Sequence, residues 1–385
     1  MKSYNITFMK KLLLFLRREL MLTISLAAAL ASLLLTPPSR ALLESIDFRT
    51  LGTLFMMLTV LEGFKKESVF APLVHFSSRF STLKGLTLFL VFGVFFSSMF
   101  VTNDVSLIIF VPLTIMILRK ADMERYILPV ISLENIAAVR GSMLTPFGSP
   151  QNLFLYGRFG VSTPVFLLHM LPLSALSAAL LVVFILVLTR KEKRIIEGPP
   201  AESTQSVNRV RRTVYPLLFL MVLLVIVTRT ALWPAAVIVV VVSVLLLDRT
   251  LLMRTDYVLL ATFLCFFIFS SSIAANPAIS AFLSELVANN EYWWSILISQ
   301  VISNVPASIV LYPFTVNRAA LIYGLDTAGL CSLIGSLASV INYRIYVREY
   351  PKRGLSFIRT FTLVSWSFFV LVVLPGYILS FWEFC

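Results

Sequence analysis

The sequence contains few charged residues. Only 13% of its 385 residues are Asp, Glu, Lys or Arg, whereas 58% are hydrophobic, and the mean hydropathy is +0.91. A soluble domain usually has about a quarter charged residues, because its surface must be polar. Uncharged stretches such as 20–36 and 171–188 match the roughly 17 to 20 residues that cross a hydrocarbon core. The composition therefore excludes a soluble protein and predicts a membrane protein.

Cysteine and histidine are also scarce, with three Cys and two His in the chain. The cysteines form no CxxC pair, and Cys265 and Cys331 lie in apolar runs, where a free thiol behaves as a small hydrophobe. His75 and His169 belong to no HExxH motif, and the chain has neither a GxSxG motif nor a Cys/His cluster. These absences argue against a membrane enzyme, so we expect no catalytic residue and no cofactor other than a coupling ion.

The charge that is present is mostly positive, and the net charge is +13. No soluble segment combines basic and aromatic residues as a nucleic-acid-binding module does, so nucleic acid is not an expected partner. Lys and Arg instead accumulate in the cytoplasmic loops of membrane proteins. With a cytoplasmic N-terminus, 26 of the 32 Lys and Arg residues fall in six predicted cytoplasmic segments, 1–19, 65–84, 119–127, 190–213, 248–256 and 344–359. This bias predicts a multi-pass protein of the inner (cytoplasmic) membrane with its C-terminus outside.

Apolar segments divide the chain into predicted elements. Two long stretches, 85–118 and 292–315, each accommodate two short helices joined at a polar tip, which predicts re-entrant hairpins; full spans joined by a tight turn are the alternative. The polar segment 190–213 has little to bury and is predicted to be a cytoplasmic linker. The predicted transmembrane helices are 20–36, 48–64, 128–157, 164–189, 214–228, 234–247, 257–274, 328–343 and 360–381.

The two halves of the chain share an order of elements and several motifs. Asp47 precedes one span in the first half and Asp256 precedes one in the second. Each predicted hairpin contains a hydroxyl residue followed by Asn, with Pro nine residues later, and the next span contains Thr/Ser-x-x-Gly-Ser. We interpret the halves as two copies of one repeat, namely 20–189 with broken helix 128–157 and 234–381 with broken helix 328–343, linked by helix 214–228.

The two repeats are predicted to have opposite orientations in the membrane. Lys84 and Arg119 flank the first hairpin, which therefore opens to the cytoplasm, whereas the second hairpin follows the Lys/Arg-free stretch 275–291 and opens outward. The chain is thus predicted to be an all-α polytopic membrane protein, with about nine transmembrane helices and two re-entrant hairpins in inverted-topology repeats with discontinuous helices. Secondary transporters with this architecture bind substrate where the broken elements meet near the midplane.

The hairpin tips and helix breaks contain the candidate binding residues. Irregular backbone is costly in hydrocarbon and survives where it lines an enclosed or watery site. Hydroxyl, amide and carbonyl oxygens suit a cation such as sodium, whereas helix N-termini favour an anion. Ordinary helix capping is the alternative, because the same residue types are preferred N-caps. The candidates are Thr102, Asn103, Asp104, Gly148, Ser149, Pro150, Gln151, Asn152, Ser303, Asn304, Gly335, Ser336 and Ser339.

Three ionisable residues lie in or beside these elements. Charged groups are expensive in a membrane and tend to face a cavity or a partner. Glu134 and Arg140 are six residues apart, on different helix faces, so a direct pair between them is not expected. Arg140 suits an anionic substrate or a carboxylate from another helix, and structural pairing is the alternative for both residues. Asp104 is placed to carry a proton or to help hold a cation.

At these residues the sequence resembles the ion transporter superfamily, which includes divalent anion/sodium symporters, citrate transporters, arsenite permeases and some sodium/proton antiporters. The Ser-Asn-Thr motif of those symporters appears as Thr102-Asn103-Asp104 and Ser303-Asn304-Val305, and a Gly-x-Pro-x-Asn motif appears as 148–152. The Asn-Asp version is most similar to that of uncharacterised citrate-transporter-like bacterial membrane proteins. The similarity extends over about 20–381.

The resemblance implies an elevator-type transporter, with a hairpin domain moving against a scaffold that forms a homodimer. It implies substrate between the tips and a sodium ion at Thr102, Asn103, Ser149 and Asn152. Val305 and the segment 337–339 depart from the motifs, which argues against a second sodium site, and Asp104 favours proton coupling. We therefore predict a secondary active transporter for a small anion, either a carboxylate or an inorganic oxyanion, coupled to sodium or protons. A cation/proton antiporter using Asp104 is the alternative.

Overall fold

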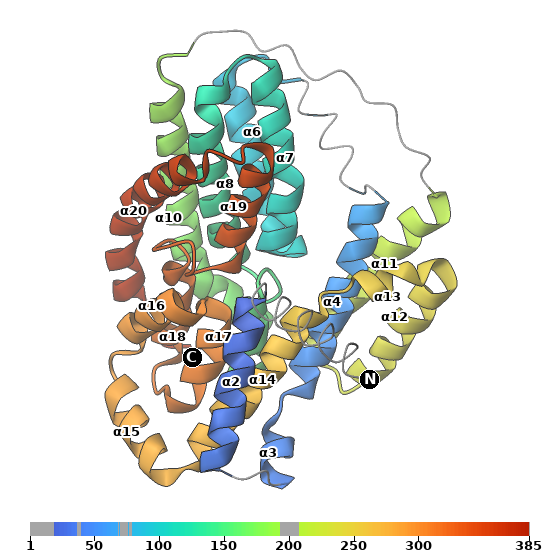
Figure 1. The fold of residues 1–385 in the computed structure, drawn as a ribbon, viewed down its shortest axis with the longest axis vertical. Helices are drawn as coiled ribbons and strands as arrows, with labels where there is room; N and C mark the ends of the chain where they lie inside the picture. The colour runs from blue at the N-terminus through green and yellow to red at the C-terminus, as the bar shows by residue number, and fades with distance from the viewer. Residues whose placement is uncertain are drawn as a thin grey trace, which may run out of the picture.

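The computed structural model describes residues 19–36, 40–67, 69, 76, 79–192 and 208–384 (Figure 1). Throughout these ranges the chain forms helices joined by turns, without a β-sheet. Five of the described helices are long and apolar enough to cross a membrane: α6 (Leu83–Val101), α10 (Thr163–Thr189), α11 (Arg209–Thr228), α14 (Tyr257–Ala275) and α20 (Gly354–Leu379). The predicted all-helical, polytopic architecture is confirmed, and the number of spans and the depth of the hairpins stay predictions.

The helices form two groups, which lie side by side in Figure 1. The lateral group packs around α4 and α14 and contains α2 (Leu20–Leu35), α3 (Arg40–Ser45), α4 (Phe48–Lys66), α11, α12 (Trp233–Asp248), α13 (Thr250–Arg254) and α14. The central group contains α6, α7 (Asn103–Lys120), η1 (Glu124–Tyr126), α8 (Ile127–Ser142), α9 (Pro150–Phe159), α10, α16 (Glu291–Ile302), α17 (Asn304–Leu311), η2 (Tyr312–Phe314), α18 (Arg318–Ala328), α19 (Leu337–Glu349) and α20. Helix α15 (Pro277–Val287) connects α14 to α16.

Equivalent helices of the two halves begin with the same capping chemistry. The Asp47 side chain accepts a hydrogen bond from the backbone N–H of Thr50 at 2.9 Å and thereby caps α4. The Asp256 side chain accepts one from the backbone N–H of Leu259 at 2.9 Å and caps α14. An N-cap carboxylate satisfies a backbone donor that has no partner within the helix. Local sequence thus determines where both lateral helices start.

The hairpins and broken elements pack in the same way in both halves. Helix α6 packs against α8, and α16 packs against α18. A Cβ on Gly141 of α8 would lie 2.0 Å from the carbonyl oxygen of Phe95, and a Cβ on Gly324 of α18 would lie 2.5 Å from that of Tyr292. Only glycine permits such close approach between helices. The second helix of each hairpin then contacts the other half, because α7 packs against α19 and α17 packs against α9.

The broken element of the second half differs from the predicted range 328–343. Helix α18 starts at Arg318 and ends at Ala328, and α19 continues from Leu337 to Glu349. The residues before 328 include polar side chains that lower the local hydropathy, so the sequence pattern assigned them to an outside segment. Asn317 instead caps α18 by accepting a hydrogen bond from the backbone N–H of Ala320, and α18 is buried from Ala319 to its end.

Candidate binding site

Each hairpin turns at a single residue with an unusual backbone conformation. Helix α6 ends and α7 begins at Thr102, which has φ 74° and ψ 153°. Helix α16 ends and α17 begins at Ser303, which has φ 68° and ψ 156°. Residues other than glycine rarely adopt positive φ, and this region costs about 1–3 kcal/mol per residue. The same strained turn, at matching hydroxyl residues, shows that the two tips are copies of one structure.

The tips are tied to the helix breaks of their own halves by matching hydrogen bonds. The backbone N–H of Asn103 donates to the Gly148 carbonyl at 3.2 Å, and that of Asn304 donates to the Gly335 carbonyl at 3.1 Å. The Thr145 hydroxyl donates to the Met99 carbonyl in the first half. In the second half Ser332 Oγ donates to Gln300 Oε1 at 2.7 Å. Each hairpin tip and the adjacent break therefore form one rigid unit.

Glycine is required at both breaks. A Cβ on Gly148 would lie 2.3 Å from the Ser142 carbonyl oxygen, and a Cβ on Gly335 would lie 2.4 Å from the Ala328 carbonyl oxygen. Ser149 and Ser336 then precede α9 and α19 in extended conformations, and neither side chain makes a capping hydrogen bond. The N-termini of both helices are left with backbone donors that their own N-cap side chains do not satisfy, as in many anion sites.

Polar side chains of the two halves meet between these breaks. Gln151 Nε2 on α9 donates to Asp326 Oδ1 on α18 at 3.2 Å. Asn135 Nδ2 on α8 donates to Ser339 Oγ on α19 at 3.0 Å. The amide of Asn152 turns back to its own break and donates to the Met143 carbonyl at 3.2 Å. The structure thus brings predicted residues of both halves together within the central group.

Several buried polar atoms in this region have no hydrogen-bond partner among the described residues. In native proteins such atoms are rare and mark strain, function or a missing ligand. Each of their side chains is at most 2% exposed. The oxygen atoms are Asn135 Oδ1, Ser149 Oγ, Gln151 Oε1, Asn152 Oδ1 and Asp326 Oδ2, and the donor nitrogens are Arg140 Nε and Nη2.

Arg140 lies at the C-terminal end of α8 and is completely buried. Its Nη1 contacts the sulfur of Met143 at 3.6 Å, whereas Nε and Nη2 have no partner in the described part of the chain. Nε and Nη2 share one edge of the guanidinium group, and their two parallel N–H bonds fit a carboxylate or another oxyanion. The charges of Arg140 and Asp326 interact electrostatically, although no direct ion pair joins these two described residues.

The other ionisable candidates lie in different surroundings. Asp104 is half-buried, and the charges with which it interacts are Lys65 and Asp256 of the lateral group. Glu134 is buried and accepts a hydrogen bond from Thr114 on α7. Arg140 is not among the partners of either carboxylate within the described residues. Asp326 is thus the carboxylate whose charge interacts with that of Arg140.

Asp326 was absent from the residues that the sequence predicted. Its segment was assigned to an outside loop, so a buried charge was not expected there. The helical signal was available, because Asn317 supplies an N-cap and an apolar run follows it as α18. The contact with Gln151 joins residues 175 positions apart and has no local signature.

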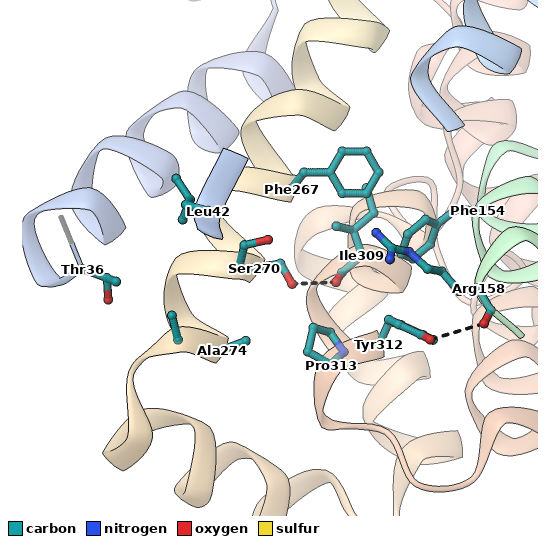
Figure 2. A pocket seen from close by; sticks show the side chains of 12 residues that line it. Thr36, Leu42, Phe154, Arg158, Phe267, Ser270, Ala274, Ile309, Tyr312 and Pro313 are labelled. Atoms are coloured by element: carbon teal, nitrogen blue, oxygen red, sulfur yellow. Dashed lines mark hydrogen bonds between the residues drawn. The ribbon is translucent and has the colours of Figure 1, made fainter. Parts of the chain in front are cut away.

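A crevice separates the central and lateral groups (Figure 2). It has a volume of about 300 Å³ and is lined mainly by apolar side chains of α14, α9 and α17. Figure 2 shows Ser270 donating to the Ile309 carbonyl across it, at 2.8 Å. Arg158 of α9 lines the crevice and forms an ion pair with Asp47, the N-cap of α4, at 3.2 Å. Further polar contacts, such as the hydrogen bond that Arg229 donates to the Tyr156 carbonyl, also join the two groups.

Comparison with known proteins finds a transporter family and two related membrane proteins. Residues 12–335 match the family described as citrate transporter. The chain is 30% identical over 308 residues to the inner membrane protein YbiR of Escherichia coli, covering 78% of this chain and 80% of that protein. It is 26% identical over 347 residues to the uncharacterized transporter MJ0456 of Methanocaldococcus jannaschii, covering 88% of this chain and 91% of that protein.

Proposed function

This chain belongs to the citrate transporter family, and on that basis we propose that it moves a small anion across the cytoplasmic membrane together with sodium ions or protons. It is a multi-pass membrane transporter rather than an enzyme. The single observation that supports the proposed cargo is the set of buried, unpartnered polar atoms between the two breaks. Unpaired buried groups are costly unless a ligand satisfies them.

The anion is proposed to bind on the free edge of Arg140. Nε and Nη2 supply two parallel donors, and the N-terminal turn of α9 supplies backbone donors that the Ser149 side chain does not cap. A carboxylate or an inorganic oxyanion fits this donor set, because both present two oxygens at the spacing of the guanidinium edge. The cation is proposed to bind among the unpartnered oxygens of the same break, with the first hairpin tip adjacent to it.

The transport movement is proposed to be of the elevator type, with the central group moving against the lateral group and a homodimer forming through the latter. Two features support this division. Each hairpin is hydrogen-bonded to its own break, and α7 and α17 pack against helices of the other half, so many contacts hold the central group together. The lateral group is joined to it through fewer elements, chiefly α14 against α17 and α4 against α9.

A cation/proton antiporter that uses Asp104 is the second candidate. The observation that favours it is that Oδ1 of this carboxyl has no hydrogen-bond partner in the described ranges, although it is enclosed at the first hairpin tip. This reading predicts that cation gradients alone support transport and that Asp104→Asn abolishes it. The anion transporter instead requires an anion for every turnover.

The test is binding followed by uptake. Thermal unfolding of the purified protein is measured with citrate, succinate, phosphate and sulfate, each with and without sodium, because a ligand of the folded state raises the unfolding temperature. The anion that binds is then used in proteoliposome uptake. Loss of a charged bidentate contact should raise the KM of Arg140→Gln by about tenfold to a hundredfold.

Arg140→Lys is the matched control. Lysine keeps the positive charge but lacks the two parallel N–H donors of the guanidinium group, so the KM of this variant should lie between those of wild type and Arg140→Gln. An unchanged KM in Arg140→Gln would remove this residue from the anion site. Absence of stabilisation by every anion, together with uptake driven by cations alone, would favour the antiporter.

A further inference from the structure

Arg140 and Asp326 form the only pair of opposite, fully enclosed charges from different halves that the described residues place in one site. Arg140 lies in the last turn of α8 in the first half, and Asp326 lies in the last turn of α18 in the second half. They are 0% and 1% exposed. Asp326 Oδ1 accepts a hydrogen bond from Gln151, whereas Oδ2 of Asp326 and Nε and Nη2 of Arg140 have no partner in the described chain.

The surroundings of this pair supply no further charge. The ionisable groups that interact with it are Tyr292 of α16, Tyr323 of α18 and Cys331 in the second break. Phenols and thiols are ordinarily uncharged near neutral pH. Glu134 is also buried, but its interactions are with Thr114 of α7 and do not include Arg140. With both side chains ionised, the local charge of the empty site is set by Arg140 and Asp326 and sums to zero.

We propose that Asp326 is a coupling residue, which makes the binding of an anion on Arg140 require one additional monovalent cation. The proposal rests on the proposed function, because it assumes that Arg140 holds the transported anion. An anion on Arg140 takes over the countercharge that Asp326 supplies in the empty site. The charge of Asp326 is then in excess, in addition to any further charge that the anion itself carries, inside an enclosed region where like charges repel strongly. A cation beside Asp326 offsets its charge.

The atoms around Asp326 fit this role. Oδ2 is unpartnered, and the carboxyl contacts both Gln151 and Asn152 of α9. The side-chain oxygens of Gln151 and Asn152 are themselves acceptors without partners among the described residues. A positive charge at this position meets a carboxylate oxygen and neutral oxygens, which are the ligands that small hard cations prefer. The anion on Arg140 and the cation between Asp326 and α9 thus occupy adjacent positions.

Charge balance also predicts the behaviour of the neutral variant. In Asp326→Asn the loaded site carries one negative charge fewer, so binding of the same anion should require one cation fewer than in the wild-type protein. The empty site then retains an unpaired positive charge. Because an unpaired charge crosses a bilayer core at great cost, net uptake should fall about a hundredfold, while anion exchange, which never moves the empty site, continues.

The experiment measures how citrate affinity depends on cation concentration in the purified full-length protein. Isothermal titration is performed in one arm with sodium varied at fixed pH, and in the other with pH varied without sodium. By linkage, each coupled cation contributes about a tenfold change in affinity for a tenfold change in its concentration. In Asp326→Asn the number of cations coupled to citrate binding should decrease by one. If it decreases in the series with varied sodium, the cation is sodium, and if it decreases in the series with varied pH, the cation is a proton. Protonation of citrate itself cancels in the comparison with wild type.

Three variants keep the result interpretable. Asp326→Glu retains the charge and should retain the wild-type cation dependence. Glu134→Gln removes an equally buried carboxyl of the same helix group and should also retain it. Asp326→Ser keeps an acceptor for Gln151 and replaces Asp326→Asn if the latter does not fold. If Asp326→Asn, or Asp326→Ser in its place, binds citrate with an unchanged cation dependence, the proposal is overturned. If the wild-type protein binds none of the tested anions, the proposed function is overturned instead.

Discussion

The two halves of this transporter share backbone geometry but differ in side-chain chemistry. Both hairpins turn at a hydroxyl residue with positive φ, and both tips donate to the glycine carbonyl of the adjacent break. After that glycine and the serine that follows it, the first half continues with Pro150, Gln151 and Asn152, whereas the second continues with Leu337, Ala338 and Ser339. The second half contributes instead the buried carboxylate of Asp326. A repeated backbone can therefore build one asymmetric site, in which each half supplies different ligand atoms.

The largest expected effect tests the shared geometry. Gly148→Ala and Gly335→Ala each place a methyl group against a backbone carbonyl, at 2.3 and 2.4 Å. Backbone atoms cannot move aside as a side chain can, so each change should destabilise the protein by about 3 kcal/mol or more and abolish uptake. Thermal unfolding in detergent and proteoliposome uptake measure both effects. Gly157→Ala is the control for space, because the only atom within 4 Å of its added Cβ is the Thr50 hydroxyl oxygen, at an ordinary contact distance of 3.8 Å. A tolerated Gly335→Ala would show that only the first break needs its geometry.

A smaller effect tests the chemical difference. Asn152 carries an unpartnered Oδ1, whereas the equivalent Ser339 Oγ already accepts a hydrogen bond from Asn135. Asn152→Ala should therefore raise the KM or the half-saturating cation concentration about tenfold or more, as expected for a lost contact to a charged ligand. Ser339→Ala should change either value by about threefold or less, the range of a neutral hydrogen bond. Equal effects in uptake assays would indicate that both halves hold ligand, contrary to the division described above.

The smallest effect concerns the turns. Thr102→Gly and Ser303→Gly should each relieve backbone strain of about 1–3 kcal/mol, partly offset by the greater freedom of glycine in the unfolded chain, for a net stabilisation of about 1 kcal/mol. The corresponding alanine variants keep the strain and should show no gain. Thermal unfolding of the four variants measures whether glycine stabilises each turn relative to alanine. Stabilisation at one tip but not at the other would mean that the two turns differ in energy despite their matching dihedral angles.

The sequence is most informative where the signal is local. The helix ends at Thr102 and Ser303 follow the hydroxyl-Asn motif, and the breaks follow Gly148 and Gly335, because glycine, proline and hydroxyl residues act on their own backbone. The pattern was less informative at α18, whose polar N-cap and buried Asp326 resemble an outside loop in hydropathy. Asp104 was grouped with the tip by sequence, but packing places it near charges of the lateral group.

The sequence by itself determined that this is an all-helical membrane protein of two related halves, because hydropathy and helix-breaking residues depend only on neighbours along the chain. Tertiary structure alone decided which side chains share a site. Gln151 meets Asp326, and Asn135 meets Ser339, only because α9 packs against α18 and α8 against α19. Such contacts depend on how the two copies fit together, and no spacing within either copy specifies them.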